Sequence, residues 1–117
     1  MNRKHLLLFL TGYILLFFLF FHGYRYIIHP DATGYLSVAE QLARGNMYDS
    51  INGIWNPLNS WILAPFLHFG FDGILTQKYL NGIYGFISLT TYFYLIKKLH
   101  INFLSQIALM ISACFLM

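Results

Sequence analysis

The sequence predicts an all-α integral membrane protein, and three observations support that fold class. The chain has 117 residues, of which 58% are hydrophobic and 9% are charged, whereas soluble domains carry about 25% charged residues. Aromatic residues alone make up 20% of the chain, which is an unusually large share. The apolar residues also gather in long runs, and a helix of about 20 apolar residues crosses a bilayer. Membrane lipids are therefore the expected surroundings of most of the chain.

The first predicted span covers residues 6–28, "LLLFLTGYILLFFLFFHGYRYII". Its one charged side chain, Arg25, can extend to the membrane interface. A cleaved signal peptide is the alternative, but the apolar stretch is longer than the usual stretch of about 7 to 15 residues and no small-residue cleavage site follows. Because Arg3 and Lys4 precede the span, the amino terminus is expected in the cytoplasm and residues 29–56 on the extracytoplasmic side.

Two further spans are predicted at residues 74–96 and 101–117. The first contains "GIYG", residues 82–85, whose glycines favour close packing of helices, and it ends at Lys97 and Lys98. Residues 57–70 are apolar over a length of only about 20 Å, short of the roughly 30 Å hydrocarbon core, and contain Pro65. They are expected to form a short interfacial or re-entrant helix. The whole chain, 1–117, is expected to be a single membrane domain and the amino-terminal part of a larger multi-span protein.

Residues 32–44 predict an amphipathic helix in the outer loop. Asp31 or Thr33 is expected to cap its start, and Gly45 stands where a helix-ending glycine belongs. Glu40 and Arg44 have the spacing of a favourable ion pair. The apolar face consists of Tyr35, Val38, Ala39 and Leu42. A short helix with one apolar face, placed just after a membrane exit, is expected to lie along the membrane surface.

Asp31 is the candidate catalytic residue. Three of the four acidic residues lie in residues 29–56, and Asp31 comes first after the predicted membrane exit. Its carboxylate could accept a proton from an incoming hydroxyl, or it could hold a divalent metal ion against a phosphate. The metal requirement stays open, because a site built from His29 and Asp31 would need further ligands.

The segment after the amphipathic helix is rich in amides and indole rings, which bind sugars by bonding hydroxyl groups and stacking on C–H faces. Candidate substrate-binding residues are Tyr35, Asn52, Trp55, Asn56 and Trp61, with Asn59 and Ser60 beside them. A structural alternative exists for some of them. Tryptophan is common at membrane interfaces, and Asn56–Pro57 is typical of a helix start. No basic, aromatic surface indicates a nucleic acid partner.

Several of these segments in order resemble the start of GT-C glycosyltransferases that use polyprenyl phosphate. The segments are the first span, "DATGYLSVAEQLARGN", "NGIWNPLNSWILAP" and a span ending in basic residues. The resemblance is closest to bacterial relatives of protein O-mannosyltransferases and of lipid A aminoarabinose transferases. The sequence differs from many relatives in having Ala32 after Asp31, where they carry a second acid.

The resemblance implies a function in the inner (plasma) membrane of a cell. A full-length enzyme of this kind transfers a sugar from a polyprenyl-phosphate donor to a lipid, glycan or protein acceptor on the outer face. The resemblance also implies that Asp31 is the base or a metal-associated carboxylate. The alternative is a small non-enzymatic multi-span membrane protein that acts by packing its helices with a partner.

Overall fold

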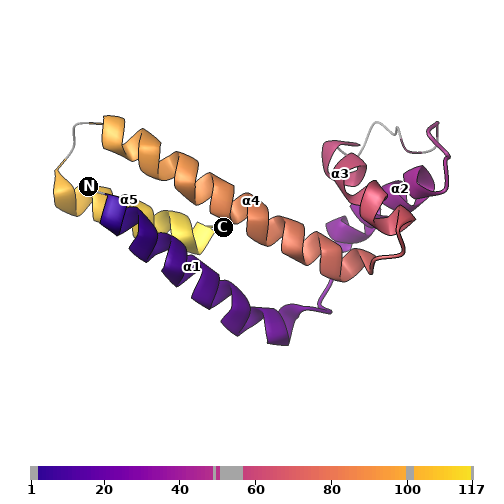
Figure 1. Ribbon diagram of the computed structural model, residues 1–117, viewed down its shortest axis with the longest axis horizontal. Coiled ribbons are helices and arrows are strands. Elements are labelled where there is room, and N and C mark those ends of the chain that lie inside the picture. The colour runs from indigo at the N-terminus through magenta and orange to yellow at the C-terminus, as the bar shows by residue number, and fades with distance from the viewer. Residues whose placement is uncertain (1–2, 49, 51–56, 100–101, 117) are drawn as a thin grey trace. The chain divides into compact units, whose positions relative to one another are not determined.

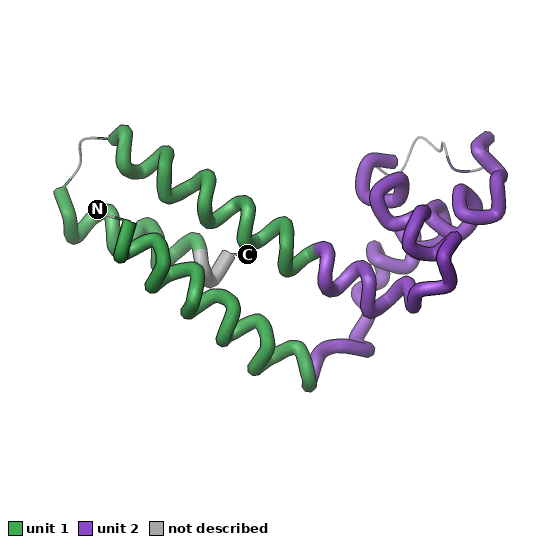
Figure 2. The backbone as a smooth tube through the Cα atoms, viewed as in Figure 1, with its two compact units in different colours: residues 1–22, 81–117 green, residues 23–80 purple. Residues whose placement is uncertain are grey.

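The computed structural model describes residues 3–48, 50, 57–99 and 102–116, and all regular structure in these ranges is helical. The helices are α1 (Arg3–Tyr24), α2 (Pro30–Ala43), α3 (Pro57–His68), α4 (Gly73–Lys98) and α5 (Phe103–Leu116) (Figure 1). They form two compact units: unit 1 contains residues 1–22 and 81–117, and unit 2 contains residues 23–80 (Figure 2). The all-helical fold class is confirmed.

The first helix is shorter than predicted at its carboxyl end. It ends at Tyr24 instead of continuing to residue 28. A turn follows, in which the Ile27 N–H donates to the Tyr24 carbonyl at 3.1 Å. Pro30 then forces the residue before it out of helical geometry, and His29 accordingly has an extended backbone with φ −75° and ψ 144°. The apolar composition of residues 6–28 does not indicate that the helix ends before residue 28.

The start of α2 corrects the predicted cap. The N-cap is His29, whose Nδ1 accepts the Asp31 N–H at 3.4 Å, and neither Asp31 nor Thr33 takes that position. Pro30 is the first helical residue, where its missing N–H costs nothing. Asp31 therefore lies inside the first turn. The Thr33 hydroxyl donates to the Pro30 carbonyl at 2.5 Å.

The carboxyl ends of α2 and α3 have the same construction. Gly45 and Gly70 have φ values of +87° and +83°, which L side chains rarely adopt. In α2 the Gly45 N–H donates to the Leu42 carbonyl and the Asn46 N–H to the Gln41 carbonyl, both at 2.9 Å. This is the Schellman arrangement, and it confirms the helix-ending role predicted for Gly45.

In α3 the equivalent bonds run from Gly70 to Leu67 at 3.0 Å and from Phe71 to Phe66 at 3.1 Å. The rings of Phe66 and Phe71 meet edge to face with centroids 6.2 Å apart, the apolar contact that often accompanies this helix ending. The carboxyl ends of α2 and α3 are therefore both defined by a glycine in the left-handed conformation.

Helices α2 and α3 pack side by side and run in the same direction. The Ser60 hydroxyl donates to the Tyr35 carbonyl at 2.9 Å, and His68 Nδ1 lies 3.1 Å from the Ala43 carbonyl oxygen. Both contacts join residues 25 positions apart, so the register is constant along the pair, as only parallel helices allow. The residues buried on the two helices are Val38, Ala39, Ser60, Leu63 and Ala64. Three of these are small, which lets the two backbones approach closely.

Unit 1 has an apolar core to which three helices contribute. Its buried members are Leu89, Phe93 and Ile96 from α4 and Met110 and Ala113 from α5. Partly buried side chains of α1 pack against this core, among them Leu6, Phe9, Leu10 and Tyr13. The glycines of "GIYG" lie under two aromatic rings of α1. A Cβ on Gly82 would lie 2.7 Å from the Phe17 ring, and one on Gly85 would overlap Tyr13. The Tyr13 hydroxyl donates to the Gly82 carbonyl at 3.1 Å. The close packing predicted for these glycines is confirmed.

Only α1 is both long enough and apolar enough to cross a membrane among the described residues. It has 22 residues and buries none of them. Helix α4 is longer, with 26 residues, but Gln77, Lys78 and Asn81 in its first half make it more polar. The apolar part of α5, Phe103–Ala113, falls short of a span. Of the three predicted spans, the first is thus supported by length and composition, and the other two stay predictions.

Asp72 caps the start of α4. Its Oδ1 accepts the Leu75 N–H at 2.8 Å. We expect Asp72→Ala to destabilise the first turn of α4 by about 1 kcal/mol, because that donor loses its partner, and Asp72→Asn to have little effect, because asparagine caps as well. Hydrogen exchange at residues 74–76 measures the difference. Equal exchange in both variants would contradict the capping role.

Candidate functional site

Asp31 lies in the first turn of α2 with 68% of its side chain exposed. The free N–H groups of a helix start favour a negative charge there. His29 is its nearest partner, with Nδ1 3.5 Å from Asp31 Oδ2, and the imidazole is 77% exposed. At such exposure an ion pair contributes little to stability. The carboxylate is therefore accessible to a ligand and is not consumed by a structural contact.

His29 Nδ1 has two possible partners that exclude one another. It can accept the Asp31 N–H at 3.4 Å only through its lone pair, whereas a contact with the Asp31 carboxylate at 3.5 Å needs a proton on the same atom. Neutral His29 therefore caps the helix, and protonated His29 pairs with the carboxylate. With His29 neutral, the structure shows no cationic partner for the carboxylate among the described residues.

Tyr35 lies one turn after Asp31, and residues four apart are neighbours on a helix surface. Its side chain is half-buried, and its carbonyl accepts the Ser60 hydroxyl. The structure thus brings two of the predicted site residues, Asp31 and Tyr35, onto one turn of α2.

Trp61 lines a hollow of about 370 Å³ between α2 and α3, most of whose lining belongs to the carboxyl-terminal parts of the two helices. The hollow is lined by Leu42, Ala43, Met47, Trp61, Ala64, Pro65, His68 and Phe69. Asp31 and Leu42 are about 16 Å apart along the axis of α2 at about 1.5 Å per residue. Most of the hollow is therefore distant from Asp31, and Trp61, which follows the Ser60 that bonds to the Tyr35 carbonyl, lies at its edge nearest to Asp31. The three other predicted substrate-binding residues, Asn52, Trp55 and Asn56, lie outside the described residues.

Two polar residues next to Trp61 in the sequence take part in packing. Asn59 and Gln77 form an amide pair between α3 and α4: Asn59 Nδ2 donates to Gln77 Oε1 at 3.0 Å, and Gln77 Nε2 lies 3.5 Å from Asn59 Oδ1. Ser60 is fully buried and bonds to the Tyr35 carbonyl. Their hydrogen bonds hold the three helices of unit 2 together.

His68 is a site residue that the sequence does not indicate. Because a carbonyl oxygen only accepts, the contact with Ala43 requires hydrogen on Nδ1. The neutral ring then carries its lone pair on Nε2, and it is one of two residues with ring N–H chemistry at the hollow, together with Trp61. The contact joins residues that are 25 positions apart in the chain, so no local sequence motif indicates it.

Metal ligands do not gather in the described part of the chain, where no group of three or more histidine, cysteine, aspartate or glutamate side chains is found. His29 and Asp31 offer two donor atoms. Such a pair would need ligands from a substrate or from outside the described ranges, so the predicted divalent metal ion stays a prediction.

Comparison with known proteins gives no match to a family model, a curated protein or a solved structure. Over the ranges that the structure describes, the fold is that of a helical protein with one helix that is able, by length and composition, to span a membrane.

Proposed function

We propose that the chain is a membrane-embedded part of a glycosyltransferase that takes its sugar from a polyprenyl-phosphate carrier. One observation supports this function most directly. The exposed carboxylate of Asp31 lies in the first turn of a helix that begins shortly after the end of α1, the helix that is able to span a membrane.

The length of the connection limits where Asp31 can lie. Residues 25–29 join α1 to α2, and an extended chain covers at most about 3.6 Å per residue. The start of α2 therefore stays within about 20 Å of the end of α1. If α1 spans the bilayer, Asp31 lies close to the headgroups, which is where the phosphate of a lipid-linked donor is found.

The chemistry needs one anionic group at that place. The acceptor hydroxyl attacks the anomeric carbon of the sugar, the bond from that carbon to the phosphate oxygen breaks, and polyprenyl phosphate leaves. Asp31 takes the proton of the attacking hydroxyl, as a general base does. Tyr35, one turn further on, is placed to contact the sugar or the acceptor. The same carboxylate could instead hold a divalent ion against the phosphate.

Sugar transfer by the intact protein tests this proposal. Membranes that contain it are given a radiolabelled polyprenyl-phosphate sugar, and labelled product is counted. Asp31→Asn keeps the size of the side chain and removes its basicity, so we expect transfer to fall by about 100-fold or more. The matched control is Asp72→Asn, which keeps its cap and should leave transfer unchanged.

Transfer at the unmodified rate in Asp31→Asn would contradict the catalytic role. An absence of transfer in every variant and donor tried, the unmodified protein included, would instead favour the non-enzymatic alternative of a membrane protein that acts by helix packing.

A further inference from the structure

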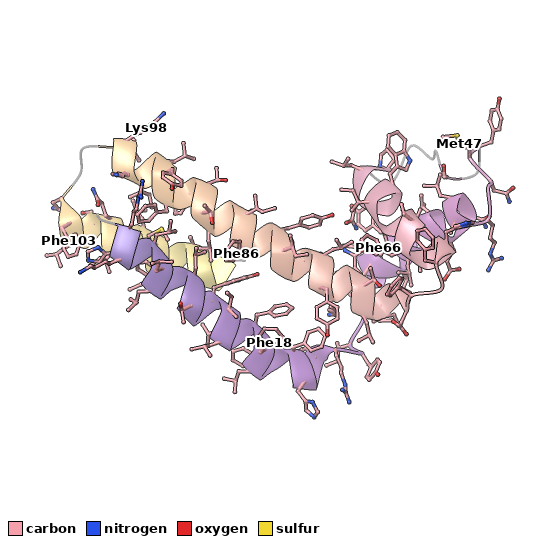
Figure 3. The ribbon with its side chains drawn as sticks, in the orientation of Figure 1. Phe18, Met47, Phe66, Phe86, Lys98 and Phe103 are labelled. Atoms are coloured by element: carbon pink, nitrogen blue, oxygen red, sulfur yellow. The ribbon has the colours of Figure 1, made fainter. Side chains whose placement is uncertain are left out.

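Helix α3 has a buried side and, opposite to it, an exposed side that is apolar. The inner side carries the buried residues Ser60, Leu63 and Ala64. The outer side is exposed and repeats at helical spacing, with Phe66 among the side chains that project from it (Figure 3). We call this side the α3 outer stripe; it consists of Leu58, Trp61, Ile62, Phe66 and Phe69.

The segment that carries the stripe contains no residue of a charged type. Residues 57–71, "PLNSWILAPFLHFGF", contain no Asp, Glu, Lys or Arg. Helix α2 presents the opposite chemistry, because its exposed residues Thr33, Ser37, Glu40 and Arg44 are polar. The α2–α3 pair therefore has one apolar side on α3 and one polar side on α2.

The structure argues against α2 as the element that binds the membrane. The sequence predicts that α2 rests on the membrane through its apolar face, but Val38 and Ala39 of that face are buried, and α2 packs on α3. That face has a protein partner. Of the two packed helices, α3 still offers an extended apolar surface among the described residues.

We propose that the α3 outer stripe binds the lipid bilayer at its interface and that α2 is carried above it toward water. This inference rests on the membrane location contained in the proposed function. The short connection to α1 keeps unit 2 near the bilayer surface. Tryptophan is favoured at that depth, and phenylalanine and leucine are typical of the apolar face of an interfacial helix. The absence of Asp, Glu, Lys and Arg means that no charged side chain has to leave water.

Two residues of α3 and the residue that follows the helix connect the stripe with the hollow. Trp61, Pro65 and Phe69 line the hollow, and all three are exposed. When the stripe contacts lipid, the hollow therefore opens at the boundary between headgroups and acyl chains. The apolar lining of the hollow then contacts the hydrocarbon part of a lipid. The phosphate of that lipid is bound near Asp31.

Spin labelling of the whole chain in phospholipid vesicles tests the inference. Cys114 is the one cysteine, so Cys114→Ser gives a background for single labels. Labels are placed on the stripe at Leu58, Ile62 or Phe66, on α2 at Thr33, Ser37 or Arg44, and on α1 at Leu15 or Leu19. Power saturation with oxygen and with a polar nickel chelate reports the surroundings. We expect the oxygen-to-nickel accessibility ratio to be about tenfold higher on the stripe than on α2, because oxygen dissolves in hydrocarbon and the chelate does not.

The α1 labels separate the two possible failures. Lipid-like values on α1 with water-like values on the stripe would overturn this inference and leave the membrane location intact. Water-like values on α1 would remove the membrane location and both proposals with it. Stripe labels shielded from both reagents and broadened by neighbouring labels would mean that a second copy covers the stripe, which also overturns the inference.

A measurement without a bulky label uses Trp61. The chain has two tryptophans, so Trp55→Phe leaves Trp61 as the sole emitter. Lipids brominated high on their acyl chains should quench it strongly, and aqueous iodide should quench it weakly. The reverse result would contradict insertion of the stripe.

Discussion

Gly85→Val should lower the apparent Tm of the protein in detergent micelles by about 10 °C. The added side chain would occupy the place of Tyr13, whose ring carbon Cζ lies 2.7 Å from the position of a Cβ. Overpacking of this kind costs about 1–3 kcal/mol, and displacement of Tyr13 also breaks its bond to the Gly82 carbonyl, worth about 1 kcal/mol. For a domain of this size about 1 kcal/mol corresponds to some 4–8 °C. The loss of helical circular dichroism on heating measures the change.

The control is Gly12→Val, the same substitution on α1 at a position with nothing within 4 Å of a Cβ. It should leave the Tm nearly unchanged. Tyr13→Leu, combined with Gly85→Val, should recover part of the loss because the shorter side chain vacates the contested space. If Gly12→Val and Gly85→Val lower the Tm equally, the effect belongs to the helix backbone and the proposed contact is wrong.

Leu63→Ala should loosen the α2–α3 pair, and its expected cost is about 2–5 kcal/mol. Leu63 is fully buried on the inner side of α3, and its truncation leaves a cavity that neighbouring side chains cannot fill without moving. Amide hydrogen exchange should accelerate along α2 and α3 and stay unchanged at the core of unit 1.

The neighbouring Ile62 provides the matched control. It is 37% exposed, so Ile62→Ala removes a similar volume from the outer side of the same turn. Exchange in α2 should then match the unmodified protein in micelles. Equal acceleration by both variants would mean that the packing of unit 2 does not depend on the inner side of α3.

Much of the helical content could be predicted from the sequence, because apolar runs and glycines are local signals. The extent of α4 and the end of α2 at Gly45 follow from them. The cap of α2 could not be predicted, because histidine is not among the usual capping residues and its role here depends on the extended geometry imposed by Pro30. The apolar face of α2 was also correctly identified. A periodic pattern shows which face of a helix is apolar but not which element packs against it, so the packing of α3 on α2 was not predicted.

The candidate site shows the same limit. The exposure of Asp31 agrees with the interpretation of a carboxylate available for chemistry, and its function stays a prediction. The position of Trp61 relative to Asp31 could not be predicted from the sequence, which places Asp31 in the outer loop and Trp61 in a separate short helix. It results from the parallel packing of two helices, which is set by the Ser60 and His68 contacts between elements.

The parallel arrangement of α2 and α3 places like poles of two macrodipoles together. The positive poles coincide where Pro30 and Pro57 begin the helices, and the negative poles coincide near Gly45 and Gly70. Such an alignment is mutually repulsive, and the ring N–H of His68, which bridges the two negative poles at Ala43, offsets part of that repulsion. Under the proposed function, the positive poles would attract an anionic headgroup to the end that carries Asp31, and the carboxylate would repel it. A phosphate held there would therefore need a cation between the two negative charges.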